Sequence, residues 1–244
     1  MRILGIIPAR YGSSRFPGKP LIDLKGKTMI QRVYEGASKS SLLTEIYVAT
    51  DDERIASSVE AVGGKAMMTF DSHTTGTDRC AEVVSKLNEQ FDVVINIQGD
   101  EPLVDARQLD QLLQAFENPD VQIATLASRK ITAEDIANPN RIKLVVDKHN
   151  KALYFSRSPI PNAVNAKGNP LEEYPFLRHI GLYAYRTSVL QEITQLSITQ
   201  LEKIESLEQL RWLYNGYSIH VVETEIETPN IDSPEDVKIV LQHL

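Results

Sequence analysis

The sequence predicts an α/β protein in which a parallel, doubly wound sheet is built by the first half of the chain. Short apolar runs of strand length alternate there with segments whose apolar residues recur at helical spacing. The 244 residues suffice for one large domain, and 42% hydrophobic and 24% charged residues are ordinary for a globular protein. We therefore treat residues 1–244 as one domain whose character changes near residue 127.

The first half contains the strand–helix alternation. The predicted strands are Ile3–Ile7, Ile46–Ala49, Lys65–Thr69, Val93–Ile97 and Gln122–Leu126. The predicted helices are Thr28–Ser40, a helix from Asp51 or Asp52 to Gly63-Gly64, Cys80–Leu87 and Ala106–Phe116. Strands and helices that alternate at this spacing favour parallel strand pairing.

The second half is expected to contain antiparallel structure. Strands over Ile142–Val146 and Ala152–Phe155 flank DKHNK, a hairpin-like turn. A long loop over Ser158–Pro175 precedes a strand whose alternation puts on one face His179, Gly181, Tyr183 and Tyr185. The chain is predicted to end with a helix over Leu201–Tyr214, a strand over Ser218–Val222 and a last helix capped by Ser233.

Charge and cysteine usage restrict the partners and the compartment. The chain has 26 Lys and Arg against 33 Asp and Glu, and this net charge of −7 argues against broad binding of nucleic acid or an anionic membrane. The single cysteine, Cys80, excludes an intramolecular disulfide and is expected to be a buried thiol. We find no signal-peptide pattern and no apolar run of about 18 residues, so we expect a cytoplasmic protein.

A cationic loop follows the first predicted strand. Its ten residues contain three cations, Arg10, Arg15 and Lys19, together with Gly12, Ser13, Ser14 and Gly18. Glycine and serine leave backbone N–H groups accessible, while arginine and lysine bind phosphate oxygens. A cationic loop on an acidic chain predicts a small anionic ligand, and we favour polyphosphate over a solvated turn. The loop has neither the dinucleotide fingerprint nor the P-loop motif.

Asp100 is the carboxylate best placed for chemistry. It follows the strand Val93–Ile97, and open α/β sheets bind ligands at the carboxyl ends of their strands. A bound triphosphate needs a divalent cation, and Mg²⁺ takes one or two carboxylates together with phosphate oxygens. Asp232, in NIDSPEDV, is the candidate second ligand. From position alone, a helix cap or turn is an equal alternative for Asp100 and the stronger one for Asp232.

Seven blocks of the sequence resemble, in order, the CMP-sugar synthetases, and most closely their 3-deoxy-manno-octulosonate cytidylyltransferase branch. The blocks lie between Ile3 and Val240 and read PARYGSSRFPGKPL, HTTGTDR, NIQGDEP, ALYFSR, RHIGLYAYR, SLEQLR and IDSPEDV. The resemblance implies a Rossmann-like three-layer sandwich of the nucleotide-diphospho-sugar transferase type, with a mixed central sheet and a small antiparallel subdomain. It also implies a homodimer in which residues 1–127 bind nucleotide and residues 128–244 bind sugar and form the dimer contact.

The resemblance also implies roles for individual residues. The positions that match the triphosphate-binding loop are Arg10, Ser14, Arg15 and Lys19. Gln98 matches a residue expected to read cytosine, Arg79 one expected near the nucleotide, and Asp100 and Asp232 the ligands of magnesium. The positions that match the sugar site are Arg157, His179, Tyr183, Glu208 and Gln209. Three exchanges depart mildly from the pattern, at Thr75, Asp78 and Ser233.

Without the resemblance, the sugar-side residues have simpler interpretations. A single arginine such as Arg157 is typical of a surface cation, and a strand histidine such as His179 is typically hydrogen-bonded within the protein. Glu208 is spaced as an i,i+3 ion-pair partner of Arg211 on a solvated helix face. These alternatives remain open at this point.

The activity that the resemblance implies is Mg²⁺-dependent nucleotidyl transfer. CTP and the eight-carbon sugar acid 3-deoxy-manno-octulosonate (Kdo) would give CMP-Kdo and pyrophosphate, for lipopolysaccharide biosynthesis. We expect catalysis by positioning and charge neutralisation from Asp100, Asp232, Lys19, Arg10 and Arg15. The alternatives are a CMP-sialate synthetase, a sugar-nucleotide-dependent glycosyltransferase and a non-catalytic nucleotide-binding module.

Overall fold

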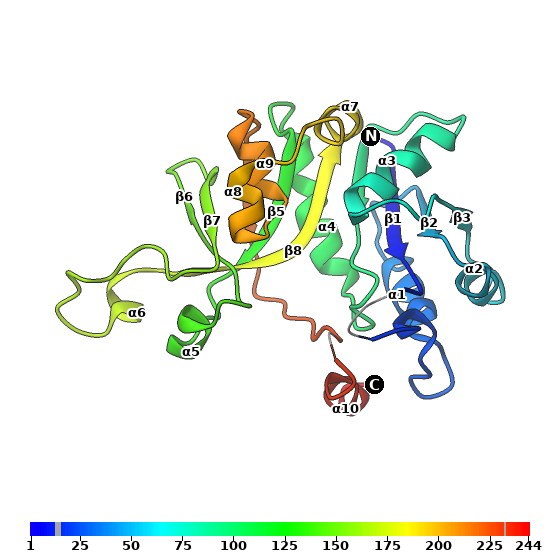
Figure 1. Cartoon of the computed structure of the whole chain (residues 1–244), viewed down its shortest axis with the longest axis horizontal. Coiled ribbons are helices and arrows are strands. Elements are labelled where there is room, and N and C mark those ends of the chain that lie inside the picture. Colours follow the sequence, from blue (N-terminus) through cyan, green and yellow to red (C-terminus); the bar gives the residue numbers. More distant parts are fainter. Residues whose placement is uncertain (13–15, 232) are drawn as a thin grey trace.

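A computed structural model describes residues 1–12, 16–231 and 233–244, and its centre is a mixed sheet of nine strands (Figure 1). The strand order is β3-β2-β1-β4-β8-β5-β9, and β6 pairs with β7 and β8 off this path. The strands are β1 Ile3–Ala9, β2 Glu45–Thr50, β3 Ala66–Met68, β4 Val93–Asn96, β5 Ile123–Ser128, β6 Lys143–Val146, β7 Ala152–Ser156, β8 Leu177–Arg186 and β9 Ile219–Glu223.

Helices connect most of these strands. The α-helices are α1 Met29–Ala37, α2 Glu53–Glu60, α3 Gly76–Lys86, α4 Ala106–Gln114, α5 Ala133–Ala137, α6 Pro170–Glu173, α7 Thr187–Ile193, α8 Gln200–Glu205, α9 Gln209–Tyr214 and α10 Asp236–Gln242. Two short 3₁₀ helices cover Lys19–Leu21 and Ala115–Glu117.

Strand β8 gives the sheet its mixed character. The first-half strands β1, β2, β3 and β4 pair in parallel, as predicted, and β5 pairs in parallel with β9. The strand β8 lies between these two groups and runs antiparallel to both, so that Ala184 faces Ile95 of β4 and Ala124 of β5. The predicted hairpin of β6 and β7 is confirmed, and it joins the start of β8.

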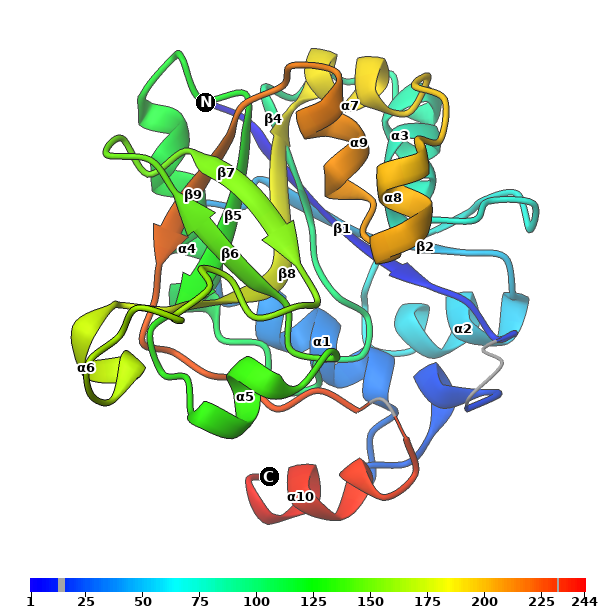
Figure 2. The same ribbon diagram turned by 60° about the vertical axis from the view of Figure 1, so that its left-hand side comes forward.

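Two apolar cores, one on each face of the sheet, give the expected three layers. One core joins the sheet to α1 and α4 through residues such as Val33 and Leu112. The other joins it to α3, α7 and α9 through residues such as Val83, Leu190 and Leu210. The turned view in Figure 2 shows α3, α7, α8 and α9 grouped beside the sheet.

A third, small core joins the two ends of the chain. Leu24 and Met29 pack with Ile231 and Val240, so α10 lies against the segment that follows β1. Figures 1 and 2 both show α10 beside this early segment, on the side of the molecule where β1 ends.

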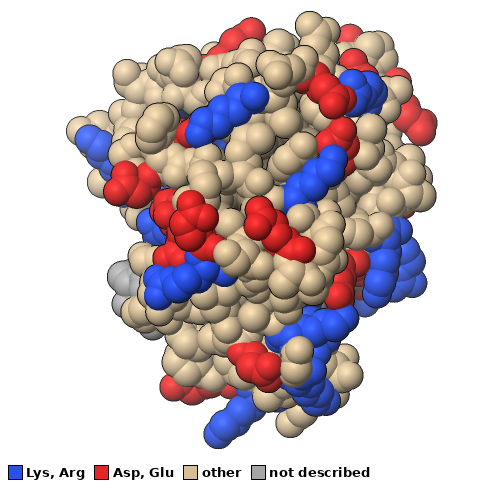
Figure 3. Space-filling view, turned by 90° about the vertical axis from the view of Figure 1, so that its right-hand side faces the viewer, with Lys and Arg blue, Asp and Glu red and all other residues tan. Residues whose placement is uncertain are grey.

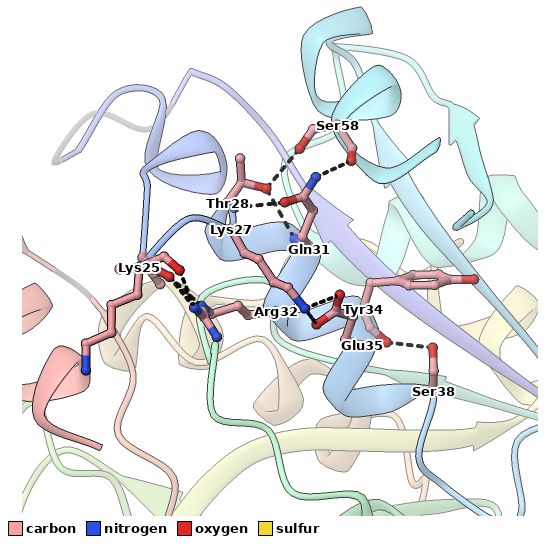
Figure 4. A network of polar contacts seen from close by, with 10 residues as sticks. Lys25, Lys27, Thr28, Gln31, Arg32, Tyr34, Glu35, Ser38 and Ser58 are labelled. Carbon is pink, nitrogen blue, oxygen red and sulfur yellow. Dashed lines mark hydrogen bonds and ion pairs between the residues drawn. The ribbon is translucent and has the colours of Figure 1, made fainter. Parts of the chain in front are cut away.

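Polar contacts hold the start of α1 and the turn just before it (Figure 4). Thr28 caps α1 as predicted: its hydroxyl accepts from the N–H of Gln31, whose side chain accepts in return from the N–H of Thr28. The hydroxyls of Thr28 and Ser58 lie 2.8 Å apart, which ties α1 to α2. Arg32 donates from Nε to the carbonyl of Leu24 (2.7 Å), which holds the turn before α1.

The prediction of one helix over Leu201–Tyr214 is wrong. The chain leaves the helix at Ser206, which has a left-handed φ of 52°, so α8 and α9 are separate helices. In the predicted single helix, Ile204, Leu207 and Leu210 would all face inward; Leu207 and Leu210 are buried, whereas Ile204 is 82% exposed. Leu207 belongs to neither helix but still packs into the core, so the helical spacing of apolar residues continues through the break between α8 and α9.

Other differences concern helix ends. Helix α3 starts at Gly76, four residues before the predicted Cys80, because Thr75 caps it by accepting from the N–H of Asp78 (3.1 Å). Helix α10 starts at Asp236, so Ser233 is not its cap; Ser233 instead donates to the Asp236 carboxylate. The predicted loop over residues 158–175 contains α6, and α5 and α7 were not predicted.

The surface carries both signs of charge, and the single thiol lies in the core as predicted. On the face in Figure 3, basic and acidic side chains are interspersed. Cys80 is a buried free thiol, and burial raises its pKa well above the ordinary value. Within the described ranges, no helix has the length and apolar character needed to cross a membrane.

Candidate active site

A cleft of about 410 Å³ opens at the carboxyl ends of β1 and β4, where the sequence places the cationic loop and Asp100. Its walls come from both halves of the chain. Arg10, Lys19 and Asp100 contribute from the first half, and Tyr183 and Glu208 contribute from the second. The sheet order explains this convergence, because β8 is inserted directly beside β4.

Lys19 and Asp100 meet at this cleft together with a segment from the end of the chain. The ammonium Nζ of Lys19 lies 2.9 Å from Oδ2 of Asp100 and 2.7 Å from the carbonyl of Ile231. The backbone N–H of Ile231 donates to the carbonyl of Asp100 (3.0 Å). Ile231 precedes Asp232, which itself lies outside the described residues, so the chain reaches the side of Asp100 one residue before the predicted second metal ligand.

The turn that carries Asp100 is packed against the end of β1. A Cβ at Gly99 would lie 2.5 Å from the carbonyl oxygen of Pro8. Only glycine permits this approach without a shift of the backbone. The glycine therefore fixes Asp100 close to the strand that leads into the cationic loop.

The cationic loop is closed at its base by the backbone. The N–H of Gly18 donates to the carbonyl of Tyr11 (3.0 Å), so the two ends of the intervening segment lie side by side. Gly18 has φ +72°, a conformation that favours glycine. Arg10 is exposed and lines the cleft, whereas the predicted phosphate ligands Ser14 and Arg15 lie outside the described residues.

Arg79 and Gln98, the two other nucleotide candidates, line the cleft but also hold the protein together. The guanidinium of Arg79 is buried, donates to the hydroxyl of Thr69 (2.6 Å) and pairs with Asp51. The side-chain amide of Gln98 donates to the carbonyl of Gly181 in β8 (2.7 Å). Arg79 thus connects α3 to Thr69 and Asp51, and Gln98 connects the first half of the chain to the second across the cleft.

On the sugar side, Tyr183 and Glu208 line the cleft. Glu208 is the first residue after Leu207 and accepts from the hydroxyl of Thr77 (2.9 Å) and from Arg211 (3.1 Å). The i,i+3 pair with Arg211 is therefore present, but the solvated helix face is not, because Arg211 is only 5% exposed. Burial raises the pKa of the Glu208 carboxyl, partly offset by the hydrogen bond from Thr77 and the charge of Arg211.

Three further sugar-side candidates lie outside the cleft lining. His179 is partly buried, with Nε2 3.0 Å from the hydroxyl of Thr125, and the loss of solvent around the ring lowers its pKa to about 3. Gln209 is buried on α9. Arg157 donates to the carbonyls of Glu205, Pro139 and Ser206, so its guanidinium is held by the protein backbone.

The cleft also contains residues that the sequence argument did not select. Thr77 comes from the first turn of α3, His73 from the segment before it and Tyr185 from β8. His73 pairs through Nε2 with Glu82. The alternation of the strand offered a signal for Tyr185, since it placed this residue on the same face as Tyr183.

The described residues fit a cation that is shared with a nucleotide rather than one enclosed by protein. Within residues 1–12, 16–231 and 233–244, no three His, Cys, Asp or Glu side chains are grouped closely enough to hold a metal ion. Asp100 offers one carboxylate at the nucleotide end of the cleft, with its side chain 29% exposed. This matches the way Mg²⁺ is bound, through one or two carboxylates, water and substrate phosphates.

Known proteins resemble this chain over its whole length. The family model described as cytidylyltransferase matches residues 4–224. A 3-deoxy-manno-octulosonate cytidylyltransferase of Bacteroides thetaiotaomicron is 54% identical, with 98% of this chain and 96% of that protein covered. The protein of the same name from Parabacteroides distasonis is 51% identical, with 100% of this chain and 98% of that protein covered.

Solved structures agree with the sequence relatives. The structure of a CMP:2-keto-3-deoxy-manno-octonic acid synthetase complexed with CTP matches with a TM-score of 0.93 at 45% identity, and both chains are fully covered (100%). A 4-diphosphocytidyl-2C-methyl-D-erythritol synthase from Anaerococcus prevotii matches at 16% identity with a TM-score of 0.64, covering 99% of this chain and 97% of that one, and shows the fold alone. The chain belongs to the cytidylyltransferase family and, within it, to the 3-deoxy-manno-octulosonate cytidylyltransferases.

Proposed function

We propose that the protein transfers a cytidylyl group from CTP to Kdo and releases pyrophosphate, a reaction that serves lipopolysaccharide biosynthesis. The observation that carries the proposal is the meeting of Lys19, Asp100 and Ile231 at one cleft, in a chain 54% identical to a 3-deoxy-manno-octulosonate cytidylyltransferase. The anomeric hydroxyl of the sugar attacks the α-phosphorus of CTP. A sugar oxygen–phosphorus bond forms as the bond to the departing pyrophosphate breaks.

The protein contributes positioning and charge. Lys19, held by Asp100 and by the carbonyl of Ile231, presents a fixed positive charge at the cleft, and Arg10 adds a second, exposed one. Together with Arg15 and Ser14 these residues would bind the triphosphate and offset the charge that develops on pyrophosphate. Gln98 and Arg79 would lie at the nucleoside end.

Magnesium belongs to this proposal, with Asp100 and Asp232 as the residues that would hold it. When bound, it supplies Lewis-acid polarisation of the α-phosphate. The pairing of Asp100 with Lys19 keeps the carboxylate oriented towards the cleft in the protein itself.

The sugar acid would bind at the other end of the cleft. Tyr183 and Glu208 line the cleft, and the carboxylate of Glu208 can bind its hydroxyl groups. By resemblance, His179, Gln209 and Arg157 belong to the same site; Arg157 would reach the sugar carboxylate by exchanging carbonyl partners that it holds here. In this arrangement residues 1–127 bind nucleotide and residues 128–244 bind sugar.

A homodimer and a cytoplasmic location complete the proposal. Large apolar side chains of the second half are exposed, including Leu153 (60%) and Ile204 (82%), which is consistent with a dimer contact there. The net charge of −7 disfavours nucleic acid and anionic membrane as partners. Sedimentation equilibrium tests the dimer: a monomer at micromolar concentration would exclude it.

The test of function is pyrophosphate release from CTP and Mg²⁺ with a panel of eight- and nine-carbon keto acids. We expect release with Kdo. Release with sialic acid alone would identify a CMP-sialate synthetase. A glycosyltransferase would consume a finished sugar nucleotide and release no pyrophosphate from CTP, and a binding module would bind CTP without turnover.

A further inference from the structure

The inference concerns Arg211, a buried arginine behind the sugar end of the cleft, and it rests on the proposed function. Glu208 lines the cleft and has two side-chain partners: the Thr77 hydroxyl at one carboxylate oxygen (2.9 Å) and Arg211 Nη2 at the other (3.1 Å). Both oxygens of Glu208 are thus held from the protein side.

Arg211 is itself fixed by groups that do not touch the cleft. Its Nη1 donates to the carbonyl of Leu196 (3.0 Å), and its Nε lies 3.1 Å from a carboxylate oxygen of Glu202. Glu202 in turn belongs to the capping box that starts α8 with Thr199. Because the guanidinium is anchored on two other sides, it defines where the Glu208 carboxylate must lie.

The main chain of Glu208 is held, because its carbonyl accepts from the N–H of Arg211 (3.0 Å), but the backbone does not fix the direction of its carboxylate. The chain leaves α8 at Ser206 in the left-handed conformation, and Glu208 stands just before the first residue of α9. Its direction therefore depends on side-chain contacts. Thr77 lies on α3 and Arg211 on α9, so the carboxylate joins two separate helices.

The charge of Glu208 also depends on Arg211. The titratable groups that face the carboxyl are Asp78 and Cys80 from α3, Tyr183 and Tyr185 from β8, and Arg211 from α9. The arginine supplies positive charge there, whereas Asp78 and burial both favour the protonated carboxyl. A protonated Glu208 would carry one O–H donor and would accept hydrogen bonds well only at its carbonyl oxygen.

We propose that Arg211 is a positioning residue that keeps the Glu208 carboxylate aimed at the cleft, where it accepts hydrogen bonds from hydroxyl groups of the sugar acid. A carboxylate suits hydroxyls rather than the substrate's own carboxylate, because like charges repel. Arg211 thereby acts on the affinity for the sugar without contacting it.

The first experiment measures Arg211→Gln by steady-state kinetics as a function of pH. We expect kcat/KM for the sugar acid to fall about tenfold at neutral pH, with KM for CTP unchanged. Loss of the cation raises the pKa of Glu208, so the acidic limb of the kcat/KM profile moves to higher pH. Arg211→Lys keeps the positive charge but loses the planar guanidinium with its several donors. Compared with Arg211→Gln, it should recover part of the activity and move the acidic limb of the profile partly back towards its original pH.

A double-mutant cycle separates positioning from simple destabilisation. If Arg211 acts through Glu208, Arg211→Gln adds no further loss for the sugar in a Glu208→Gln background. The matched control is Arg186→Gln at the far end of β8, which also removes an arginine that donates to backbone carbonyls. It should lower the melting temperature while leaving the pH limb and both KM values unchanged.

A titration without substrate keeps this inference distinct from the proposed function. In carbon-13 NMR spectra, the carboxyl carbon signal of Glu208 can be assigned by its absence in Glu208→Gln. The midpoint of its pH titration should lie higher in Arg211→Gln than in the unmodified protein. The same titration midpoint in both proteins overturns the inference, as does full additivity in the cycle. An unmodified protein that releases no pyrophosphate with any sugar acid overturns the proposed function instead.

Discussion

The two sides of the cleft differ in how their charged groups are satisfied. On the nucleotide side, Lys19 binds the Asp100 carboxylate and the backbone carbonyl of Ile231 at the carboxyl ends of β1 and β4, where Asp100 stays partly exposed. On the sugar side, Glu208 is held by Thr77 and by an arginine that is itself buried and anchored. The difference indicates that Lys19 and Asp100 can exchange their partners for phosphate and metal, whereas the Glu208 carboxylate is preorganised.

Two lysines show the same contrast. Lys19 pairs with a carboxylate in the cleft, whereas Lys143 in β6 is fully buried and donates to three carbonyls, those of Asn138, Arg141 and Arg157. Burial and the nearby charge of Arg157 lower the pKa of Lys143. The first lysine is placed for a ligand, and the second for the backbone around Arg157.

The largest effect is expected from Asp100→Asn. Removing the charge while keeping the size should lower kcat by about 10³-fold, equivalent to about 4 kcal/mol, because the substitution weakens both the metal site and the hold on Lys19. The melting temperature should change little, since the backbone bond from Ile231 remains. Asp105→Asn, an N-cap of α4 with similar exposure, is the matched control. Near-normal kinetics of Asp100→Asn in saturating Mg²⁺ would contradict its metal role.

On the sugar side, Lys143→Met should act mainly on stability. The substitution removes the buried ammonium that three carbonyls share as their donor, for a loss of about 3 kcal/mol in the free energy of unfolding measured in urea. Lys148→Met, on the exposed turn between β6 and β7, is the control and should unfold like the unmodified protein. Equal urea midpoints of unfolding for both variants would show that other groups donate hydrogen bonds to these carbonyls in Lys143→Met.

His179 should make the sugar half sensitive to acid. Its pKa is about 3 in the folded protein, below the ordinary 6.5, so the unfolded chain binds more protons between these values. The stabilising contribution is therefore complete above pH 6.5 and is lost as the pH falls towards 3, by up to about 1.4 kcal/mol per pH unit. The slope of unfolding free energy against pH should be shallower in His179→Asn and unchanged in His149→Asn, which alters an exposed histidine. Parallel slopes for all three proteins would be inconsistent with a His179 that is neutral in the folded protein.

The smallest effect is expected from Arg157→Ala. We expect KM for the sugar acid to rise about fivefold and KM for CTP to change less, which corresponds to about 1 kcal/mol of binding. Kinetics with each substrate varied at saturating levels of the other provide the measurement. A larger rise for CTP than for the sugar would remove Arg157 from the sugar side.

Local sequence signals predicted the nucleotide side better than the sugar side. Runs such as Ile3–Ile7 are apolar throughout because parallel strands are covered on both faces, and Thr28 and Asp52 are caps that act within one turn. The break at Ser206 carried no such signal, because a non-glycine residue adopts the left-handed conformation there while the apolar spacing continues.

The convergence of the site had no local signal at all. Lys19 and Ile231 are 212 positions apart, and only the tertiary fold brings them together. Apolar periodicity specifies which face of an element is buried but not which distant element covers it. The family resemblance supplied the pairing of Asp100 with the IDSPEDV segment, and the contacts of Ile231 now give the physical basis for that proximity.

The small core of Leu24, Met29, Ile231 and Val240 has a consequence for biosynthesis. The segment that follows β1 leaves the ribosome early, whereas its packing partners Ile231 and Val240 emerge much later. A nascent chain thus exposes Leu24 and Met29 until these partners have been synthesised, and Lys19, 212 positions before Ile231, cannot contact the Ile231 carbonyl before then. An affinity tag attached directly after Leu244 would sit four residues from Val240, so a purification handle at the opposite terminus is the safer choice.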